Sequence, residues 1–516
     1  MLDATSIAYN GWCKRRRAGP VSHVASLGSG ESVRGGSEYL GRADEGLSAK
    51  GALAVVSKVA PGLGTLVTNL LIGRLGGAGL LGLTQTAVST AALASLVYSS
   101  PAAAAASRFV AADVAAGYPE RAKAVAGYLS RRVIFATSVL CALGAVALSC
   151  AGASNPQAIA VACIMTLGTS ARVFVEGLHF GGGKARRLAG WSLAIAVAGV
   201  AGSALMLVTG VRSTWVIAPV AVANVVFAVS TWPTTARLKL ERQHRLRLKR
   251  FLILAAVGTL SSAGFLQLTT LVASAAGGIA FAGAYAAALT LTAPLAIAST
   301  AISSTLFPAL SAMGANGQLK QAKARVSQAT QMLGTVIGAA VCLLIVLSAP
   351  VVSVVWGQGY ADTWWILCFL LSGTLVTSIA VPSVTSITSA SNRGMLVSAA
   401  SSVLAAGIGL LIWLFLVPSQ AELGVIVGCT VATVLTGTIP YAIAWRRFSM
   451  AWLRPTAELV GLISLGWASA VAASVGLVDS AMLPFIAALL LLAWCVLRRR
   501  DLVQIWLLVG NVRRRR

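Results

Sequence analysis

Polar side chains in the first apolar segment, 51–73, follow the spacing of one helix face. Thr65 and Asn69 stand seven and eleven residues after Lys58, which places the three within about 20° of one another on a helix. A cation, a hydroxyl and an amide together in apolar surroundings indicate a cavity that binds an anion. The alternative is that Lys58 extends to polar headgroups and Thr65 bonds its own backbone, which does not explain Asn69. We therefore expect Lys58, Thr65 and Asn69 to bind substrate.

Arg172, Glu176 and His179 form a second group, in the apolar segment 157–180. Their i, i+4, i+7 spacing places them within about 60° on one helix face. Arg and Glu at this spacing can form an ion pair, which lowers the cost of burying either charge. Such a group is a candidate for ion coupling or gating, with Arg172 also a substrate-binding cation. A structural salt bridge, with His179 at the headgroup level, is the slightly favoured alternative. We take Glu176 as the only intramembrane carboxylate.

Other polar and aromatic residues have simpler expected roles. Arg74, at the outer end of the first segment, either holds an anionic group as it leaves or anchors the helix at the interface. Tyr285 and Thr290 are expected to form hydrogen bonds between helices. An aromatic belt at the outer interface is expected from Trp356, Tyr360, Trp364 and Trp365.

Composition identifies the elements that must position these residues. The chain has 516 residues, of which 57% are hydrophobic and only 10% charged, with a mean hydropathy of +0.83. Such a chain cannot cover a water-exposed surface with polar groups, so a soluble enzyme is excluded. Spanning a bilayer takes about 20 apolar residues per helix. Fourteen segments meet this length, and we predict an all-α integral membrane protein with helices at about 51–73, 80–104, 133–152, 157–180, 188–210, 214–232, 251–275, 279–308, 331–355, 363–390, 395–417, 423–445, 456–477 and 481–497.

The basic residues give these helices an orientation. The net charge is +26, with 40 Lys and Arg against 14 Asp and Glu. With a cytoplasmic N-terminus, 36 of the 40 fall on the cytoplasmic side and only Arg74 and Arg212 on the other. This split obeys the positive-inside rule, so we predict cytoplasmic N- and C-termini. The charge attracts anionic membrane lipids and does not imply nucleic acid.

An internal repeat divides the chain. GGAGLLGLTQTA from Gly76 matches GGIAFAGAYAAA from Gly277 at an offset of 201, and GYPERAKA from Gly117 matches GQLKQAKA from Gly317 at an offset of 200. Six helices thus repeat in the same orientation, as two lobes related by an axis along the membrane normal. We predict a disordered basic cytoplasmic tail (1–48), an N-lobe (49–232), a basic linker (233–250), a C-lobe (251–447), helices 13 and 14 (448–500) and a basic C-terminal tail (501–516).

Motifs of enzymes and metal sites do not occur in the sequence. It contains no GxxxxGK[ST], no HExxH and no CxxC, and its three histidines are scattered. ATP hydrolysis, a metal site and a disulfide framework are therefore not expected. We predict no cofactor and no catalytic residue.

Several segments resemble the polysaccharide (O-antigen-type) flippases of the multidrug/oligosaccharidyl-lipid/polysaccharide exporter superfamily. They are TNLLIGRLGGAGLLGLTQTA (68–87), AGAYAAALTLTAPLAIASTAISSTLFPALSAM (282–313), WGQGYADTWWILCFLL (356–371) and ITSASNRGMLV (387–397). The resemblance extends over residues from about 50 to about 450. It implies two six-helix lobes around a central cavity that opens alternately to each side. It also implies transport of an undecaprenyl-diphosphate-linked oligosaccharide across a bacterial cytoplasmic membrane, commonly coupled to a proton or sodium gradient.

A lipid-linked oligosaccharide and membrane lipids are the expected partners, together with glycosyltransferases or a polymerase of the same pathway. Three other functions stay open, and one of them is a scaffold for envelope assembly without transport. A multidrug/cation antiporter of the same fold needs acidic cavity residues, whereas this chain has an excess of basic ones. A membrane glycosyltransferase or polymerase acting on a lipid-linked sugar needs outward-facing acids and usually a large outer loop, which the sequence lacks.

Overall fold

The computed structural model describes residues 36–150, 156–182, 184–233, 240–315, 318–390, 392–448, 451–499 and 501–503. The chain divides into two units, 1–49 and 50–516, and apart from the start of α2 every feature described below belongs to the second. The predicted tails at 1–48 and 501–516 lie mostly outside the described residues, so they stay predictions.

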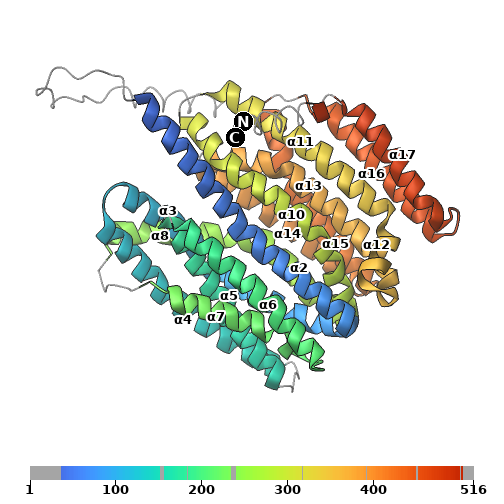
Figure 1. Ribbon diagram of the computed structural model, residues 1–516, viewed down its shortest axis with the longest axis horizontal. Helices are drawn as coiled ribbons and strands as arrows, with labels where there is room; N and C mark the ends of the chain where they lie inside the picture. The colour runs from blue at the N-terminus through green and yellow to red at the C-terminus, as the bar shows by residue number, and fades with distance from the viewer. Residues whose placement is uncertain are drawn as a thin grey trace, which may run out of the picture. The chain divides into compact units, whose positions relative to one another are not determined.

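The described residues form helices joined by short turns, and no strand occurs among them. In chain order (Figure 1), the helices are α2 (Gly36–Val97), α3 (Ser99–Ala115), α4 (Pro119–Cys150), α5 (Pro156–Gly181), α6 (Ala185–Val208), η1 (Thr214–Ile217), α7 (Ala218–Thr231), α8 (Arg242–Thr259), η2 (Leu260–Gly264), α9 (Phe265–Ala276), α10 (Gly278–Ala315), α11 (Leu319–Val346), α12 (Ser348–Trp356), η3 (Gln358–Thr363), α13 (Trp364–Ala390), α14 (Asn392–Leu416), α15 (Ala421–Phe448), α16 (Leu453–Ser474), η4 (Ser480–Met482) and α17 (Leu483–Leu497).

Thirteen helical stretches of the described chain are long and apolar enough to cross a membrane. The first of them, Val59–Val97, is not one straight helix, because Gly77 interrupts it with φ 77° and ψ 177°. A positive φ is readily adopted only by glycine. The break separates two arms of this stretch of α2, 59–76 and 78–97, each close to a bilayer-spanning length. The predicted all-helical membrane fold with about fourteen spans is confirmed.

Helices extend farther than the apolar segments predicted. The segments 105–132 and 309–330, expected as cytoplasmic loops, are largely helical: α3 ends at Ala115 and α4 begins at Pro119, while α10 reaches Ala315. Hydropathy marks only the part of a helix that lies in hydrocarbon. The polar continuations are rich in alanine and other strong helix formers, so the helices go on past that part.

The helices pack as two lobes. In the first lobe α5 contacts α3, α4 and α7, and α6 packs on α7; in the second, α13 contacts α10, α11 and α15, and α14 packs on α15. α8 touches both α3 and α14, so it connects the lobes. α16 and α17 pack against α11. This arrangement is the predicted pair of six-helix lobes with two additional C-terminal helices.

The two repeats meet where the second arm of α2 crosses α10. A Cβ on Gly82 would stand 1.9 Å from the Ile279 carbonyl oxygen, and one on Gly283 would stand 1.9 Å from the Ala78 carbonyl oxygen. The contacts are reciprocal at the offset of 201 that the sequence repeat shows. Gly278, the counterpart of Gly77, likewise has a positive φ, of 84°. Glycine is required here because the two backbones touch at an approximate two-fold axis.

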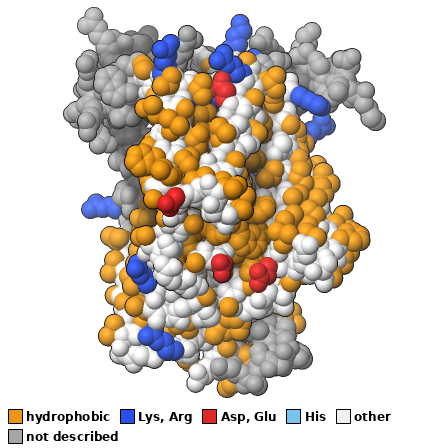
Figure 2. Space-filling view, turned by 90° about the vertical axis from the view of Figure 1, so that its right-hand side faces the viewer, with side chains coloured by type: hydrophobic (Ala, Val, Ile, Leu, Met, Phe, Trp, Pro, Cys, Tyr) orange, Lys and Arg blue, Asp and Glu red, His pale blue; other side chains and the backbone are white. Residues whose placement is uncertain are grey.

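Apolar side chains cover much of the outer surface. The face shown in Figure 2 is largely hydrophobic, with only a few charged side chains. Of the four residues of the predicted aromatic belt, Trp364 and Trp365 are partly exposed, whereas Trp356 and Tyr360 do not contribute to the surface. Both are buried, and the Tyr360 hydroxyl donates to the Gly73 carbonyl oxygen at 3.3 Å. Because Gly73 has no side chain, the Trp356 ring can pack against its α-carbon. The sequence pattern does not reveal this contact.

Candidate functional site

A small cavity lies in the first lobe, beside the first arm of α2. In Figure 1 this arm runs between α6 and α10. The cavity measures about 70 Å³, room for about two water molecules. Its lining brings together α2, α5, α6, η1 and α7: Pro61, Gly64, Thr65, Thr68, Asn69, Val88, Met165, Arg172, Ile195, Ala196, Gly199, Ile217 and Val220.

The cavity joins both groups of residues that the sequence singled out. Thr65 and Asn69 come from α2 and Arg172 from α5, and all three line it. The Thr65 hydroxyl also donates to the Pro61 carbonyl oxygen at 3.0 Å. This is the hydrogen bond to its own helix backbone that the sequence analysis gave as the alternative role of Thr65. The remaining lining is apolar apart from Thr68. The arrangement therefore places one guanidinium, two hydroxyls and one amide in otherwise apolar walls.

Arg172 is held in place by two partners. Its Nε donates to Glu176 Oε1 at 2.9 Å, and its NH1 donates to Asn224 Oδ1 at 3.1 Å. The side chains of Arg172 and Glu176 are 17% and 10% exposed. The predicted ion pair forms, which offsets the cost of burying both charges. These bonds use two of the five guanidinium N–H donors. Asn224 is a functional candidate that sequence reasoning missed, although an amide in the middle of the apolar segment 214–232 was a signal for it.

Asn69 connects the cavity wall to the second lobe. Its Nδ2 donates to Thr290 Oγ1 on α10 at 3.0 Å. The Thr290 hydroxyl in turn donates to the Ala286 carbonyl oxygen at 2.7 Å. Thr290 therefore forms the interhelical bond expected of it. Any separation of α2 from α10 at this level must break the bond to Asn69.

The other predicted site residues lie elsewhere. Lys58 is on α2, one or two turns before the cavity, but its side chain lies outside the described residues. Arg74 is exposed and donates to the Val354 carbonyl oxygen at 3.0 Å, so it caps the C-terminal end of α12. His179 Nδ1 donates to the Val175 carbonyl oxygen at 3.0 Å. The described contacts give His179 no bond to Arg172, although their spacing placed them on one face.

Glu176 is not the only carboxylate in the helical bundle, which corrects the sequence analysis. Asp113 on α3 is buried, and its Oδ2 has no hydrogen-bond partner among the described residues. Glu458 on α16 lies 3.1 Å from Arg498 and 2.8 Å from Arg454. Asp113 was missed because its segment was taken as a loop, and Glu458 because it stands at the very start of its apolar segment.

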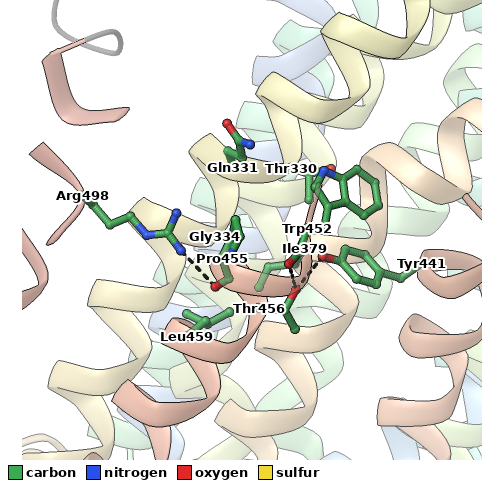
Figure 3. Close-up of a pocket in the computed structure, with 10 residues that line it drawn as sticks. All are labelled: Thr330, Gln331, Gly334, Ile379, Tyr441, Trp452, Pro455, Thr456, Leu459 and Arg498. Atoms are coloured by element: carbon green, nitrogen blue, oxygen red, sulfur yellow. Dashed lines mark hydrogen bonds between the residues drawn. The ribbon is translucent and has the colours of Figure 1, made fainter. Parts of the chain in front are cut away.

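A second pocket, of about 30 Å³, lies between α11, α13, α15, α16 and the end of α17 (Figure 3). Arg498 donates to the Pro455 carbonyl oxygen at 2.9 Å, and the Tyr441 and Thr456 hydroxyls are 2.9 Å apart. Tyr441 also stacks on Trp452, with ring centroids 4.6 Å apart. A space of this size holds one water molecule, so the cluster fastens α16 and α17 to the second lobe.

Solved structures identify the class of fold. A multidrug resistance MATE family transporter of the MOP superfamily, in an inward-facing conformation, has a TM-score of 0.59 at 14% identity over 77% of this chain and 98% of that chain. The lipid II flippase MurJ, in an inward closed conformation, has a TM-score of 0.62 at 12% identity over 88% of this chain and 100% of that chain. A MOP superfamily transporter from Pyrococcus furiosus, described as having a binding pocket of reverse polarity, has a TM-score of 0.51 at 15% identity over 77% of this chain and 94% of that chain.

The chain is therefore a multi-pass membrane protein with the fold of the multidrug/oligosaccharidyl-lipid/polysaccharide exporter superfamily. Residues 184–364 match the model of a family described as polysaccharide biosynthesis protein. These findings agree with the resemblance described from the sequence: the fold is that of the MATE transporter and MurJ structures, and residues 184–364 match a polysaccharide biosynthesis family. By sequence alone, the chain matches no curated protein.

Proposed function

We propose that the protein translocates an undecaprenyl-diphosphate-linked oligosaccharide across the bacterial cytoplasmic membrane, without a covalent catalytic step, for the synthesis of cell-surface polysaccharide. The observation that carries this proposal is Arg172 lining an apolar-walled cavity together with Thr65 and Asn69. A diphosphate is an anion, and its sugar is too polar to cross hydrocarbon unaided. Guanidinium, hydroxyl and amide groups replace water around both parts. The family match to polysaccharide biosynthesis supports the same substrate class.

The cavity must enlarge for this substrate to enter. Its volume of about 70 Å³ is smaller than a single sugar ring with its substituents. Alternating access supplies the space, because the two lobes separate on one side of the membrane at a time. The bond between Asn69 and Thr290, 3.0 Å long, breaks when α2 moves away from α10. The Asn69 amide and the Thr290 hydroxyl then become available to the substrate.

A proton or sodium gradient is the proposed source of energy, with Glu176 as the coupling residue. In the closed arrangement Glu176 pairs with Arg172 at 2.9 Å. An anionic substrate competes with the carboxylate for the guanidinium. Neutralisation of Glu176 by a cation releases Arg172 to the substrate, so that ion and substrate binding become linked.

Substrate binding to a matched pair of variants tests the proposal. Arg172→Gln with Glu176→Gln removes the cation without leaving a buried carboxylate unpaired. A charge-assisted bond contributes on the order of 1.5–3 kcal/mol, so we expect the double variant to bind a lipid-linked diphosphate sugar about 10- to 100-fold more weakly in nanodiscs. Arg187→Gln, on the exposed end of α6, is the control. If the double variant binds as the wild type does, the pair is structural only and the proposed site is wrong.

A multidrug/cation antiporter is the second candidate function. The observation that favours it is the likeness to the MATE transporter, in which the fold serves multidrug resistance. Binding of a cationic dye, abolished by Glu176→Gln and unaffected by lipid-linked diphosphate sugar, would favour this candidate over the flippase.

A further inference from the structure

A groove outside the candidate site gathers basic side chains from two helices. It lies between α4 and α8, has a volume of about 250 Å³ and is lined by Tyr128, Arg132, Arg242, Arg245, Leu246 and Lys249. Its six lining residues thus include four cations and no carboxylate. Among the described residues, no Asp or Glu forms an ion pair with any of the four.

A ring contact positions one cation of the groove, and helical spacing brings the other three to one side of α8. The Arg132 guanidinium lies 5.4 Å from the centroid of the Tyr128 ring, one helical turn earlier on α4. Arg242, Arg245 and Lys249 are spaced three and four residues apart, so they share one face of α8. Four positive charges at one hollow repel one another unless an anion joins them.

Both walls of the groove continue into exposed apolar faces. On α4, Phe135 follows Arg132 at i+3 and is 70% exposed, and Val139 and Leu143 follow it on the same face with exposures of 41% and 60%. On α8, Ile253 follows Lys249 at i+4 and is 66% exposed. The surface therefore changes from cationic to apolar along both helices. A molecule that fits it has an anionic head and hydrocarbon chains.

We propose that this groove binds the phosphodiester headgroup of an anionic glycerophospholipid, with the acyl chains along α4 and α8. Charge complementarity selects the headgroup, as for other basic pockets between membrane helices, and the exposed apolar faces select a lipid over a free anion. α8 contacts α3 of the first lobe and α14 of the second. A lipid bound between α4 and α8 would therefore contact the helix that connects the two lobes.

Lipid binding to purified protein in a neutral detergent tests the proposal. The groove variant is Arg242→Gln with Arg245→Gln. Its control, Arg247→Gln with Arg250→Gln, removes the same charge from the same helix at exposed positions that do not line the groove. We expect phosphatidylglycerol to bind the wild type and the control alike, and the groove variant about 30-fold more weakly, which corresponds to about 2 kcal/mol. Arg242→Lys with Arg245→Lys should retain most of the binding, because it keeps both charges.

Four outcomes overturn the proposal. They are equal binding of phosphatidylcholine, equal binding of inorganic phosphate, equal loss in the control variant, and stronger binding of a polyprenyl diphosphate than of phosphatidylglycerol. The first three would reduce the groove to non-specific attraction or a simple anion site. The fourth would make it an entrance for the transported substrate. Because Arg172 and Glu176 are unchanged throughout, the result is independent of the proposed transport function.

Discussion

At the scale of single residues, one guanidinium determines the character of the site. Arg172 would be too costly to bury alone, and Glu176 and Asn224 together stabilise it at the cavity wall. The same partners keep the site neutral in the closed arrangement. In the proposed mechanism, the cavity becomes cationic only when Glu176 is neutralised or displaced.

Lys58 adds a second cation if its side chain reaches the cavity. Lys58→Ala should then weaken binding of a lipid-linked diphosphate sugar about 10- to 100-fold in nanodiscs at fixed salt, because one charge-assisted contact is lost. Lys58→Arg should keep much of the affinity, since the charge remains although its geometry differs. A lysine that only reaches the lipid headgroups predicts unchanged affinity for both variants, and that result would remove Lys58 from the site.

The site could be predicted from the sequence only in part. Helical spacing correctly grouped Thr65 with Asn69 and Arg172 with Glu176, because spacing within one helix depends on local geometry alone. It could not show that α2 and α5 bring the groups to one cavity. It also did not show the hydrogen bonds of Arg74 and His179, which are to backbone carbonyl groups. Such bonds depend on packing that the pattern of residue types does not encode.

At the scale of elements, the crossing of α2 and α10 holds the two repeats together. The fold was predictable to this level, since Gly76–Gly77 and Gly277–Gly278 mark the same turn in both halves. The close contact of Gly82 with Gly283 was predictable only as a sequence match. Its physical meaning, that two backbones touch, required the packed structure.

Adding a methyl group at this crossing should destabilise the protein. Gly82→Ala and Gly283→Ala each push a Cβ to within 1.9 Å of a carbonyl oxygen unless the helices shift. Overpacking of this kind costs about 1–3 kcal/mol, so the thermal unfolding temperature in detergent should fall for both variants. Gly79→Ala, in the same arm of α2 with no atom within 4 Å of the added Cβ, is the control and should leave that temperature equal or slightly higher. Equal temperatures for all three variants would contradict the close crossing.

At the scale of the whole molecule, the charge split predicts how the bundle sits in the membrane. Gln318 precedes α11 and Gln358 follows α12, and both are exposed. In a variant without the eight native cysteines, Gln318→Cys should react with an impermeant thiol reagent only from the cytoplasmic side, and Gln358→Cys only from the outer side. Reaction of both from one side would contradict the fourteen-span topology and the orientation drawn from it.

The most direct test of transport is translocation in proteoliposomes. A lipid-linked diphosphate oligosaccharide is placed in the membrane, and its appearance on the opposite face is measured by access to an added glycosidase. The wild type should move the lipid faster under an imposed proton or sodium gradient than without one. Arg172→Gln with Glu176→Gln should lower that rate at least about 10-fold, in line with the loss of one charge-assisted contact. A wild type that leaves the lipid-linked sugar on its original face, but moves a cationic dye along the same gradient, would contradict the proposed function.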